Sequence, residues 1–416
     1  MSRFNKHFHM TTDDVIEYAK ERLTIFDKNA HLFCEEIGDG NINYVFRVRD
    51  SVSNKSIVIK HADASTRSSF RPLDPTHNRI EASALELEAK LEPGYVPDVY
   101  YYDPVMCCIC MEDLHEYNNM RNMMLLHRTY PNFAEQITTF LTETLIRTTD
   151  NIISPEEKRR LVVKYTNPEL CEITERLVYT DPYNDAHGKN IIFEPNAKFV
   201  EENLYNNTVV QIEVGKLKDS FKSNCQSLVH GDMHTGSIMI NSKGIKLLDP
   251  EFSCYAPAGF DIGTLIANLV FAWVNGAMTI NDNEEKNHYL SWLEDAITKV
   301  IDLFNKKAEK LLKEETIERM AKFESFRKWY LKGILEDSAG SCGVELNRRI
   351  VGSAKVKDIT SITNETSRLI AERTCILMAN NCILNRTSKF SKGEDYVNAL
   401  KHAFEEANDS IDNKSY

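Results

Sequence analysis

A chain of 416 residues can form one large domain or two lobes, and its length favours two lobes. Its formal net charge of −12 and its isoelectric point near 5.6 argue against a general nucleic-acid-binding protein, which normally presents a basic face. We therefore expect no nucleic-acid partner, although a few local donors and a cation are enough to bind a phosphate-bearing small molecule.

The N-terminal stretch and the distribution of apolar residues predict a cytoplasmic protein that has no membrane contact. The start, MSRFNKHFHMTTDDV, carries charges and lacks an apolar core, so it does not resemble a secretory signal. No run approaches the roughly 18 uninterrupted apolar residues of a membrane span. The ten cysteines are most simply reduced thiols. Cys107 and Cys110 have the spacing of half a zinc site, but no second pair completes it, so we expect both on a buried strand.

The first third of the chain is predicted to be rich in strands and to carry one inserted helix. A short helix over residues 13–23, with Thr12 as its N-cap, precedes the strands. The inserted helix covers residues 79–91 and stops before Pro93 and Gly94. The predicted strands cover residues 32–37, 44–48, 56–59, 99–102 and 105–111.

After about residue 113 the pattern becomes mainly helical. Three of the clearest predicted helices cover residues 133–148, 286–312 and 362–384, whereas residues 182–207 are predicted to be a looped insertion. The chain is therefore predicted to form a small β-rich lobe, residues 1–112, and a large helical lobe, residues 113–416. A ligand is expected in the cleft between two such lobes.

Two glycines and a lysine in the first lobe suggest a phosphate site. Gly38 and Gly40 lie between two predicted strands in EEIGDGNINYVFRV, and glycine lets backbone N–H groups approach phosphates closely. The same residues also suit an ordinary hairpin turn. Lys60 ends the third strand, where a kinase carries its phosphate-pairing lysine. A lone lysine after an apolar run is, however, often solvated.

The strand over residues 107–111 is predicted to connect the lobes. Backbone C=O and N–H groups from Glu112 to Leu114 are natural partners for an adenine ring. The features also follow the order found in kinases: glycine turn, strand lysine, helix with glutamates, connector, and then two acidic motifs. Unrelated motifs would rarely occur in this order by chance.

The stretch VHGDMHTGSIMINSKGIKLLDPEF contains those two acidic motifs. A buried carboxylate is costly unless something pairs with it. Asp232 occupies the place of the kinase aspartate that receives the proton of the attacking hydroxyl. Asp249 and Glu251 follow the next strand on alternate positions, where both can face one Mg²⁺ against nucleotide phosphates. The alternative is a set of capping or ion-paired acids in loops.

A pair of arginines near the C-terminus is the last candidate. Arg348 and Arg349 follow small residues in SAGSCGVELNRRIVGSAKVKDI and precede an apolar run. Adjacent helical residues point about 100° apart, so a cleft can use one arginine or both. Their forked donors suit sugar oxygens or phosphate. The alternative is a solvated surface pair.

These segments together resemble the 5-methylthioribose kinase family, in the protein-kinase-like group that also holds the choline and aminoglycoside kinases. The resemblance covers nearly the whole chain. HGD is shared by the wider group, whereas HTGS, DPEF and the twin arginine are particular to the methylthioribose kinases. The matching segments are EIGDGNINYVFRV, VIK, MEDL, NPELCEITE, DPY, HGDMHTGSIMI, DPEF, GFDIGTLIANL and CGVELNRRIVG.

The resemblance implies an α+β, bilobal protein-kinase-like fold with a small β-rich N-lobe and a large, mainly helical C-lobe. It implies a homodimer that uses ATP and Mg²⁺ to phosphorylate the 1-hydroxyl of 5-methylthioribose in methionine salvage. By resemblance, Asp232 is the catalytic aspartate, and Asp249 and Glu251 hold the metal. The implied nucleotide contacts are Asn43, Lys60, Glu112 and Leu114, beside the glycine turn, and the implied substrate contacts are Asp232, Arg348 and Arg349.

The sequence departs from these patterns in two places. Ser237 stands where general kinases carry an asparagine metal ligand; the methylthioribose kinases also have serine there, so Glu251 is expected to replace that ligand. Phe70 stands where the family commonly has a tryptophan in a loop over the nucleotide. One assignment is also left open, the helical partner of Lys60. The candidates are Glu81, which aligns best, Glu86 and Glu88.

Two other functions are weighed against this one. A kinase of the same fold could act on another small alcohol, of choline or aminoglycoside type. Choline needs an aromatic cage and a polycation needs an acidic pocket, and the arginine pair disfavours both. A pseudokinase that binds nucleotide without turnover is the other alternative. It is disfavoured by the presence of every expected polar group: Lys60, Asp232, Asp249 and Glu251.

Overall fold

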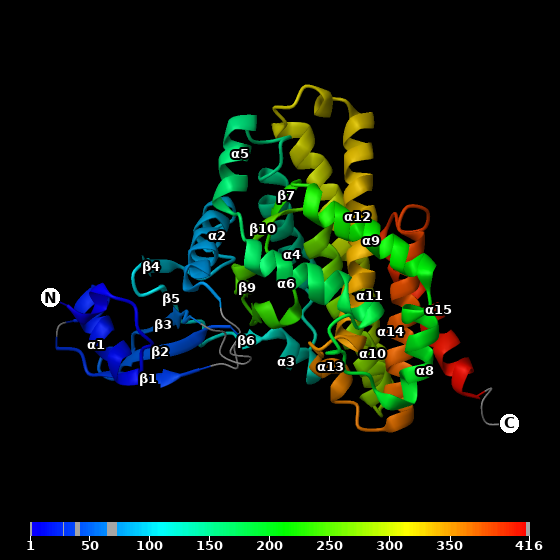
Figure 1. Cartoon of the computed structure of the whole chain (residues 1–416), viewed down its shortest axis with the longest axis horizontal. Coiled ribbons are helices and arrows are strands. Elements are labelled where there is room, and N and C mark those ends of the chain that lie inside the picture. The colour runs from blue at the N-terminus through cyan, green and yellow to red at the C-terminus, as the bar shows by residue number, and fades with distance from the viewer. Residues whose placement is uncertain (1, 28, 38–41, 65–72, 413–416) are drawn as a thin grey trace. The chain divides into compact units, whose positions relative to one another are not determined.

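The computed structural model describes residues 2–27, 29–37, 42–64 and 73–412, and it divides the chain into two compact units. The first unit contains Met1–Tyr117 and Lys246–Ser253, and the second contains Asn118–Ile245 and Cys254–Tyr416. The predicted α+β class is confirmed, because the first unit holds an antiparallel sheet and the second is mostly helical (Figure 1). The segment Lys246–Ser253 belongs to the first unit, whereas it was predicted to lie in the lobe that starts at residue 113.

Five antiparallel strands form the sheet of the first unit, in the order β1-β2-β3-β5-β4. Their bounds are β1 Leu32–Glu36, β2 Tyr44–Asp50, β3 Ser56–His61, β4 Val99–Asp103 and β5 Cys108–Glu112. The central strand β3 is buried at every residue after Ser56. Lys60 on β3 pairs with Val45 of β2 and with Ile109 of β5. The sheet therefore holds the Lys60 backbone from both sides.

Strand β5 begins three residues later than the sequence predicted, because a turn occupies residues 104–107. Asp103 Oδ1 accepts the backbone N–H groups of Val105 at 2.8 Å and Met106 at 3.0 Å. Cys107 then adopts a φ of +49°. Cys107 and Cys110 are both buried and form no disulfide, but only Cys110 lies on the predicted strand, because Cys107 belongs to the turn before β5.

Two helices accompany the sheet. Helix α1, Thr12–Arg22, packs against β1 and β2 (Figure 1). Its N-cap is Thr11, not the predicted Thr12, because the Thr11 hydroxyl and the Asp14 carboxylate cap each other's backbone N–H groups. Helix α2, Asn78–Leu91, starts one residue before the predicted helix. Its first side chain, Asn78, donates to the Cys107 carbonyl at 2.9 Å, which ties the helix start to the edge of β5.

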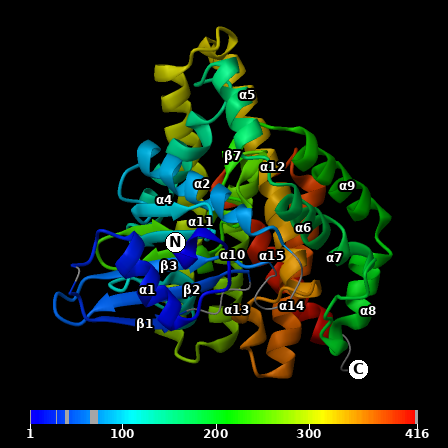
Figure 2. The same cartoon turned by 60° about the vertical axis from the view of Figure 1, so that its left-hand side comes forward.

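The second unit is built on long helices. Helices α10, α12 and α14 run side by side, and α11 and α15 pack against them (Figures 1 and 2). The long helices are α10 Gly259–Thr279, α11 Asn283–Glu315, α12 Glu324–Val351, α14 Glu365–Asn385 and α15 Gly393–Asp412. The remaining helices are α3 Met120–Leu125, α4 Phe133–Leu141, α5 Pro155–Lys164, α6 Pro168–Tyr179, α7 Asp181–Asn184, α8 Ala197–Val200, α9 Thr208–Ser223 and α13 Lys357–Thr360.

Three of these assignments can be compared with the sequence analysis. The predicted helix over residues 133–148 is α4 followed by a π-helical turn, Thr142–Ile146. The predicted helix over residues 286–312 lies inside the longer α11. The prediction of a looped insertion over residues 182–207 was wrong in part, because α7, α8 and a π-helical turn at Glu201–Tyr205 lie there. Helices this short show too little periodicity to be recognised from sequence.

Short strands in the second unit carry the HGD motif. Strand β7, Ser227–Val229, pairs antiparallel with β10, Cys254–Ala256. Strand β8, Ile238–Ile240, pairs antiparallel with β6, Asn118–Asn119. Residues 230–237 therefore connect β7 to β8, and because both strands are paired, both ends of this loop are fixed.

Helix α10 is the one helix of the described residues that is long and apolar enough to cross a membrane. Its most apolar window is 83 % buried inside the structure, which is typical of the core helix of a soluble protein.

Small residues let helix α10 approach α12 closely. A Cβ added at Gly263 would lie 2.3 Å from the Ser338 carbonyl oxygen and 2.5 Å from the Cys342 nitrogen.

We expect Gly263→Ala to lower the thermal midpoint of the protein. The added methyl group meets backbone atoms, so the helices have to separate, and overpacking of this kind costs about 1–3 kcal/mol. The measurement is the unfolding midpoint by differential scanning fluorimetry or calorimetry.

Gly333→Ala is the matched control on α12, because an added Cβ there meets no atom within 4 Å. Alanine favours helix over glycine by about 0.5–1 kcal/mol, so this variant should keep or raise the midpoint. An unchanged midpoint for Gly263→Ala would contradict the close packing of α10 on α12.

Candidate active site

The side chain of Lys60 is the centre of a buried charge cluster in the first unit. Lys60 is 4 % exposed, and its Nζ lies 2.8 Å from Glu81 Oε1 and 2.8 Å from Asp249 Oδ1. Glu251 Oε2 lies 3.5 Å from the same nitrogen. The structure therefore brings the strand lysine together with both acids of the DPE motif. It also identifies Glu81 as the partner on α2, whereas Glu86 is exposed.

The charge state of this cluster follows from burial and from the number of carboxylates. Burial disfavours the Lys60 ammonium, but the three carboxylates outweigh it and hold the pKa of Lys60 well above its ordinary value. Burial raises the pKa of Glu81 to about 7, and the charge of Asp249 adds to this rise while Lys60 opposes it. Lys60 therefore stays protonated, because three carboxylates lie close to its ammonium group.

A strained turn brings Asp249 and Glu251 to Lys60. Asp249 has φ +62° and ψ +46°, a left-handed conformation that is uncommon for residues other than glycine. Pro250 follows it, and residues before proline normally avoid helical backbone angles. The chain then turns through a 3₁₀ turn, Pro250–Phe252, so that both carboxylates face the same lysine. Strain of this kind is typical of functional sites.

Asn43, the residue before β2, supports the cluster. Its Nδ2 donates to Glu251 Oε2 at 2.7 Å, and its Oδ1 lies 3.1 Å from His77 Nε2. Asn43 is only 2 % exposed. The structure thus gives Asn43 a role in holding Glu251, and its predicted contact with nucleotide stays a prediction. Gly38, Gly40 and Phe70 lie outside the described residues, so their predicted roles stay predictions as well.

The predicted adenine-binding segment follows β5. The Glu112 backbone N–H donates to the Asp98 carbonyl at 2.9 Å, and the Glu112 carboxylate pairs with Lys246 at 2.5 Å. Leu114 is buried, and its carbonyl accepts the Tyr117 N–H at 2.9 Å. An adenine ring would therefore have to use the remaining backbone groups of Glu112 to Leu114.

The carboxylates of Asp249 and Glu251 fit a Mg²⁺ site. Both lie within 3.5 Å of one nitrogen atom, and 46 % of the Asp249 side chain is exposed, which leaves room for further ligands. Among the residues that the structure describes, no three His, Cys, Asp or Glu side chains form a group able to hold a metal. Two carboxylates are nevertheless what Mg²⁺ commonly takes from a protein when phosphates and waters complete its shell.

In the second unit, the loop after β7 fixes Asp232 through its backbone. Gly231 has φ +84°, which favours glycine, and Asp261 of α10 accepts the N–H groups of His230 at 2.6 Å and Gly231 at 3.0 Å. The Asp232 carbonyl accepts the Ser237 hydroxyl at 3.0 Å. Ser237, which stands where general kinases have an asparagine ligand, thus stabilises the loop.

Arg348 and Arg349 are not a solvated surface pair. Their side chains are 14 % and 8 % exposed, and Glu345 pairs with both, at 3.1 Å from Arg348 Nη1 and 2.6 Å from Arg349 Nε. Arg349 Nη2 lies 3.8 Å from Asp232 Oδ1. Burial acts to raise the pKa of Asp232, but His234 and the two arginines outweigh it and hold that pKa below its ordinary range.

Sequence reasoning missed three charged or polar groups around Asp232. His234 Nε2 lies 3.3 Å from Asp232 Oδ2. Glu345 orients both arginines, as described above. Arg121 of α3 donates to Asn268 Oδ1 at 2.8 Å, and burial together with the nearby Arg349 charge lowers the pKa of Arg121. The HTGS motif offered a signal for His234, but nothing in the sequence marked Arg121.

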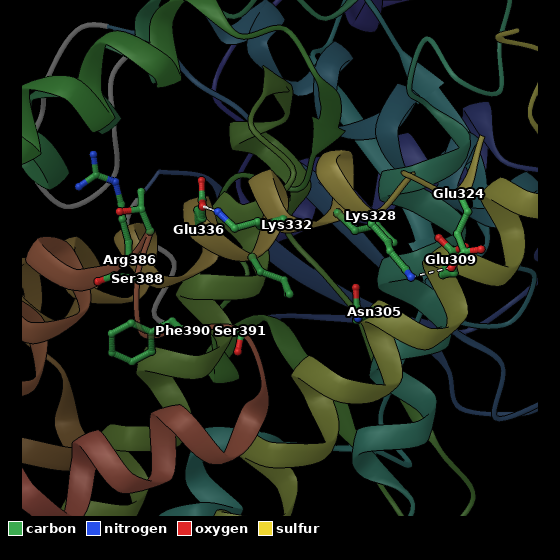
Figure 3. Close-up of a pocket in the computed structure, with 13 residues that line it drawn as sticks. Asn305, Glu309, Glu324, Lys328, Lys332, Glu336, Arg386, Ser388, Phe390 and Ser391 are labelled. Carbon is green, nitrogen blue, oxygen red and sulfur yellow. Dashed lines mark hydrogen bonds and ion pairs between the residues drawn. The ribbon is translucent and has the colours of Figure 1, made fainter. Parts of the chain in front are cut away.

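A separate cavity in the second unit contains none of these residues. It has a volume of about 480 Å³ and lies among α11, α12 and the segment after α14 (Figure 3). Its basic groups are already paired with carboxylates: Lys328 with Glu324, Lys332 with Glu336, and Arg386 with Glu213. This cavity therefore offers no free cation to an anionic ligand.

The geometry agrees with the families that the sequence matches. Residues 214–284, which include Asp232, Asp249 and Glu251, match the model of the phosphotransferase enzyme family known as APH. The class of protein is thus a phosphotransferase.

Whole-chain comparisons are more specific. The methylthioribose kinase of Bacillus pumilus strain SAFR-032 is 35 % identical over 364 residues, 87 % of this chain and 89 % of that protein. The methylthioribose kinase of Bacillus cereus strain AH820 is 35 % identical over 379 residues, 91 % of this chain and 93 % of that protein. The chain belongs to the methylthioribose kinase family.

Solved structures similar to this chain include a choline kinase from Cryptosporidium parvum Iowa II, with a TM-score of 0.44 and 9 % identity over 97 % of both chains. A glucosamine kinase in complex with glucosamine, ADP and inorganic phosphate has a TM-score of 0.45 and 12 % identity. That alignment covers 82 % of this chain and 81 % of the glucosamine kinase.

We expect Glu81→Ala to lower the thermal midpoint and to raise the KM for ATP. Removing one partner of a buried ion pair typically costs about 3–5 kcal/mol, and the two carboxylates that remain should keep the loss at the lower end. Lys60 would then be held only by the carboxylates that we expect to bind metal. The measurements are the unfolding midpoint and steady-state kinetics with varied ATP.

Glu86→Ala is the control, because Glu86 is on the same helix but exposed. This variant should change neither the unfolding midpoint nor the KM for ATP. If both variants behave alike, Glu81 does not hold Lys60.

Proposed function

We propose that the chain transfers the γ-phosphoryl group of ATP to the 1-hydroxyl of 5-methylthioribose, giving 5-methylthioribose 1-phosphate for methionine salvage. The observation that carries the proposal is membership of the methylthioribose kinase family over about nine tenths of the chain. The buried cluster of Lys60 with Asp249 and Glu251 supports it, because a chain without turnover has no need to keep this costly set of charges together.

The charges around Asp232 support a neutral substrate. Three arginines, Arg121, Arg348 and Arg349, lie near three carboxylates, Asp232, Glu345 and Asp358. Arg349 Nη2 lies 3.8 Å from Asp232 Oδ1, and Arg121 and Arg348 interact with Asp232 electrostatically, so a quaternary ammonium or a polycationic drug would meet like charge there. A sugar offers hydroxyl oxygens that such donors can bind. Kinases of choline or aminoglycoside type are therefore the weaker alternative.

In the proposed mechanism, Asp232 accepts a hydrogen bond from the sugar 1-hydroxyl and aims its oxygen at the γ-phosphorus. The O–H bond breaks as the new O–P bond forms, and the proton passes to Asp232 while ADP leaves. Arg349 lies beside Asp232 and is proposed to bind the ribose, with Arg348 in a weaker role. Positioning and charge neutralisation supply most of the rate in such reactions.

Lys60 is proposed to neutralise charge on the ATP phosphates. Its Nζ makes ion pairs in this structure and can exchange a carboxylate for a phosphate oxygen without losing its charge. Asp249 and Glu251 would hold Mg²⁺, which offsets phosphate charge when bound. The Gly38 and Gly40 turn, Asn43, and the backbone from Glu112 to Leu114 are proposed nucleotide contacts.

A homodimer and a cytoplasmic location complete the proposal. The homodimer follows from the resemblance to the family, and the location from the ten cysteines, which form no disulfide among the residues that the structure describes.

The test of the function is a panel of alcohols assayed for ATP-dependent ADP release. 5-Methylthioribose should be the best substrate by kcat/KM, and choline and kanamycin should give no release above background, because their cationic groups would face the arginines. Product analysis by ³¹P NMR should find the phosphate on carbon 1.

Asp232→Asn serves as the control enzyme in this panel. Loss of a positioned base typically lowers the rate by about 10²–10⁴-fold, while ADP should still bind. Near-normal turnover by this variant would refute the role of Asp232. Release with choline or kanamycin but not with the sugar would refute the substrate.

A separate prediction concerns the metal. Asp249→Asn and Glu251→Gln should each raise the Mg²⁺ concentration that gives half-maximal activity by about tenfold or more, because each removes one anionic ligand. The exposed Asp295→Asn on α11 is the control and should leave this concentration unchanged. Equal Mg²⁺ dependence in all three variants would show that the metal is bound elsewhere.

A further inference from the structure

The imidazole of His234 lies between two partners of different chemistry. Its Nδ1 lies 3.0 Å from the backbone nitrogen of Ser237, and its Nε2 lies 3.3 Å from Asp232 Oδ2. A backbone N–H can only donate, and an ionised carboxylate can only accept. To form both hydrogen bonds, Nδ1 has to accept from the Ser237 N–H and Nε2 has to donate to the Asp232 carboxylate.

This arrangement selects one tautomer of His234. With the proton on Nε2, both contacts are hydrogen bonds. With the proton on Nδ1, the Ser237 Oγ at 3.1 Å could accept it, but the Ser237 N–H would lose its acceptor on the ring and the lone pair of Nε2 would face the Asp232 carboxylate. The Ser237 N–H is also shared with the His234 carbonyl at 2.9 Å, which closes the turn but still directs the hydrogen toward Nδ1.

The surroundings keep the ring neutral. Burial lowers the pKa of His234, and the charges of Arg121 and Arg349 lower it further, against the opposing effect of Asp232. A doubly protonated ring would also take away the Nδ1 lone pair that accepts the Ser237 N–H. Burial, two like charges and the loss of this hydrogen bond thus outweigh the single favourable carboxylate.

The ring is also held in place mechanically. A Cβ added at Gly236 would lie 2.8 Å from His234 Cε1 and 3.2 Å from Arg121 Nη1, so the loop passes directly over the imidazole. Asn119 donates to the Gly236 carbonyl at 2.6 Å and fixes that crossing. His234 therefore cannot swing away from Asp232 without moving the loop.

We propose that His234 is a positioning residue for the phosphoryl transfer: as a neutral Nε2–H tautomer it binds Asp232 Oδ2 and leaves Oδ1 to receive the sugar hydroxyl. This inference rests on the proposed function of Asp232. His234 gains and loses no proton in the reaction; the proton of the 1-hydroxyl passes to Asp232 alone. The His234 bond fixes the rotation of the carboxyl group, and Arg349, 3.8 Å from Oδ1, borders the oxygen that receives the hydroxyl.

The proposal predicts a pH effect with a definite sign. Asp232 faces His230 and His234 from its own loop, Arg121 from α3, Asp261 from α10, and Glu345, Arg348 and Arg349 from α12. Removing the His234 donor takes away a group that stabilises the ionised carboxylate and leaves the burial that destabilises it. The acid limb of kcat/KM, which reports the base of the free enzyme, should therefore move to higher pH.

The experiment compares His234→Ala with His234→Gln. The glutamine amide can place an N–H near the position of Nε2, whereas alanine places none there. We expect His234→Ala to lower kcat by about 10²-fold and to shift the acid limb upward, with the KM for ATP unchanged. His234→Gln should recover most of the wild-type kcat, and the acid limb of its kcat/KM profile should lie at the wild-type pH. His288→Ala, at an exposed histidine of α11, is the control and should behave as wild type.

A second measurement needs neither turnover nor a stable variant. Long-range ¹H–¹⁵N NMR of wild-type protein labelled with ¹⁵N-histidine reads the tautomer of each ring directly. His234 should have a bare Nδ1 and a protonated Nε2 at every pH from 6 to 9. A protonated Nδ1, or a titration within that range, would overturn the proposal even if the enzyme is fully active. Equal kinetics of the alanine and glutamine variants would overturn it as well, whereas inactivity of the wild-type enzyme on methylthioribose would instead refute the proposed function.

Discussion

The first unit depends on one buried ammonium group. Lys60 is almost completely removed from water, and an unpaired buried cation costs several kcal/mol. Glu81 from α2 and the carboxylates of Asp249 and Glu251 offset that cost. These partners come from a helix and from a turn almost 190 residues later in the chain, so the ion-pair cluster links segments that the sequence keeps far apart. The fold is therefore built around the same charges that a nucleotide and its metal would use.

The second unit stabilises a partly buried negative charge, whereas the first unit stabilises a buried positive charge. Asp232 is a partly buried carboxylate, and His234 and two arginines keep it ionised. A strongly stabilised carboxylate is a weak base, so the role proposed for Asp232 is to orient a hydroxyl and to accept its proton late. The Asp261 carboxylate accepts two backbone N–H groups of the loop, and the Ser237 hydroxyl donates to the Asp232 carbonyl. In both units the group proposed to act is thus held before any substrate arrives.

Much of this was predictable from sequence, and the failures have physical causes. The strand carrying Lys60 and the HGD and DPE motifs are local patterns, so they were found. Glu81, Glu86 and Glu88 share one helix, and only tertiary packing decides which of them faces Lys60. The same holds for residues 246–253, which pack with the first unit because of contacts with residues before 117. Arg121 is a single charge on a short helix, and no periodic pattern marks it.

One triphosphate and its cation are proposed to bind the Lys60 cluster, and the sugar hydroxyl is proposed to bind Asp232. A crystal structure with a non-hydrolysable ATP analogue, Mg²⁺ and 5-methylthioribose tests it most directly. We expect Mg²⁺ on the carboxylates of Asp249 and Glu251, Lys60 Nζ on a phosphate oxygen, and the 1-hydroxyl within hydrogen-bond distance of Asp232. A cation bound away from those two carboxylates, or a sugar whose 1-hydroxyl faces another residue, would contradict it.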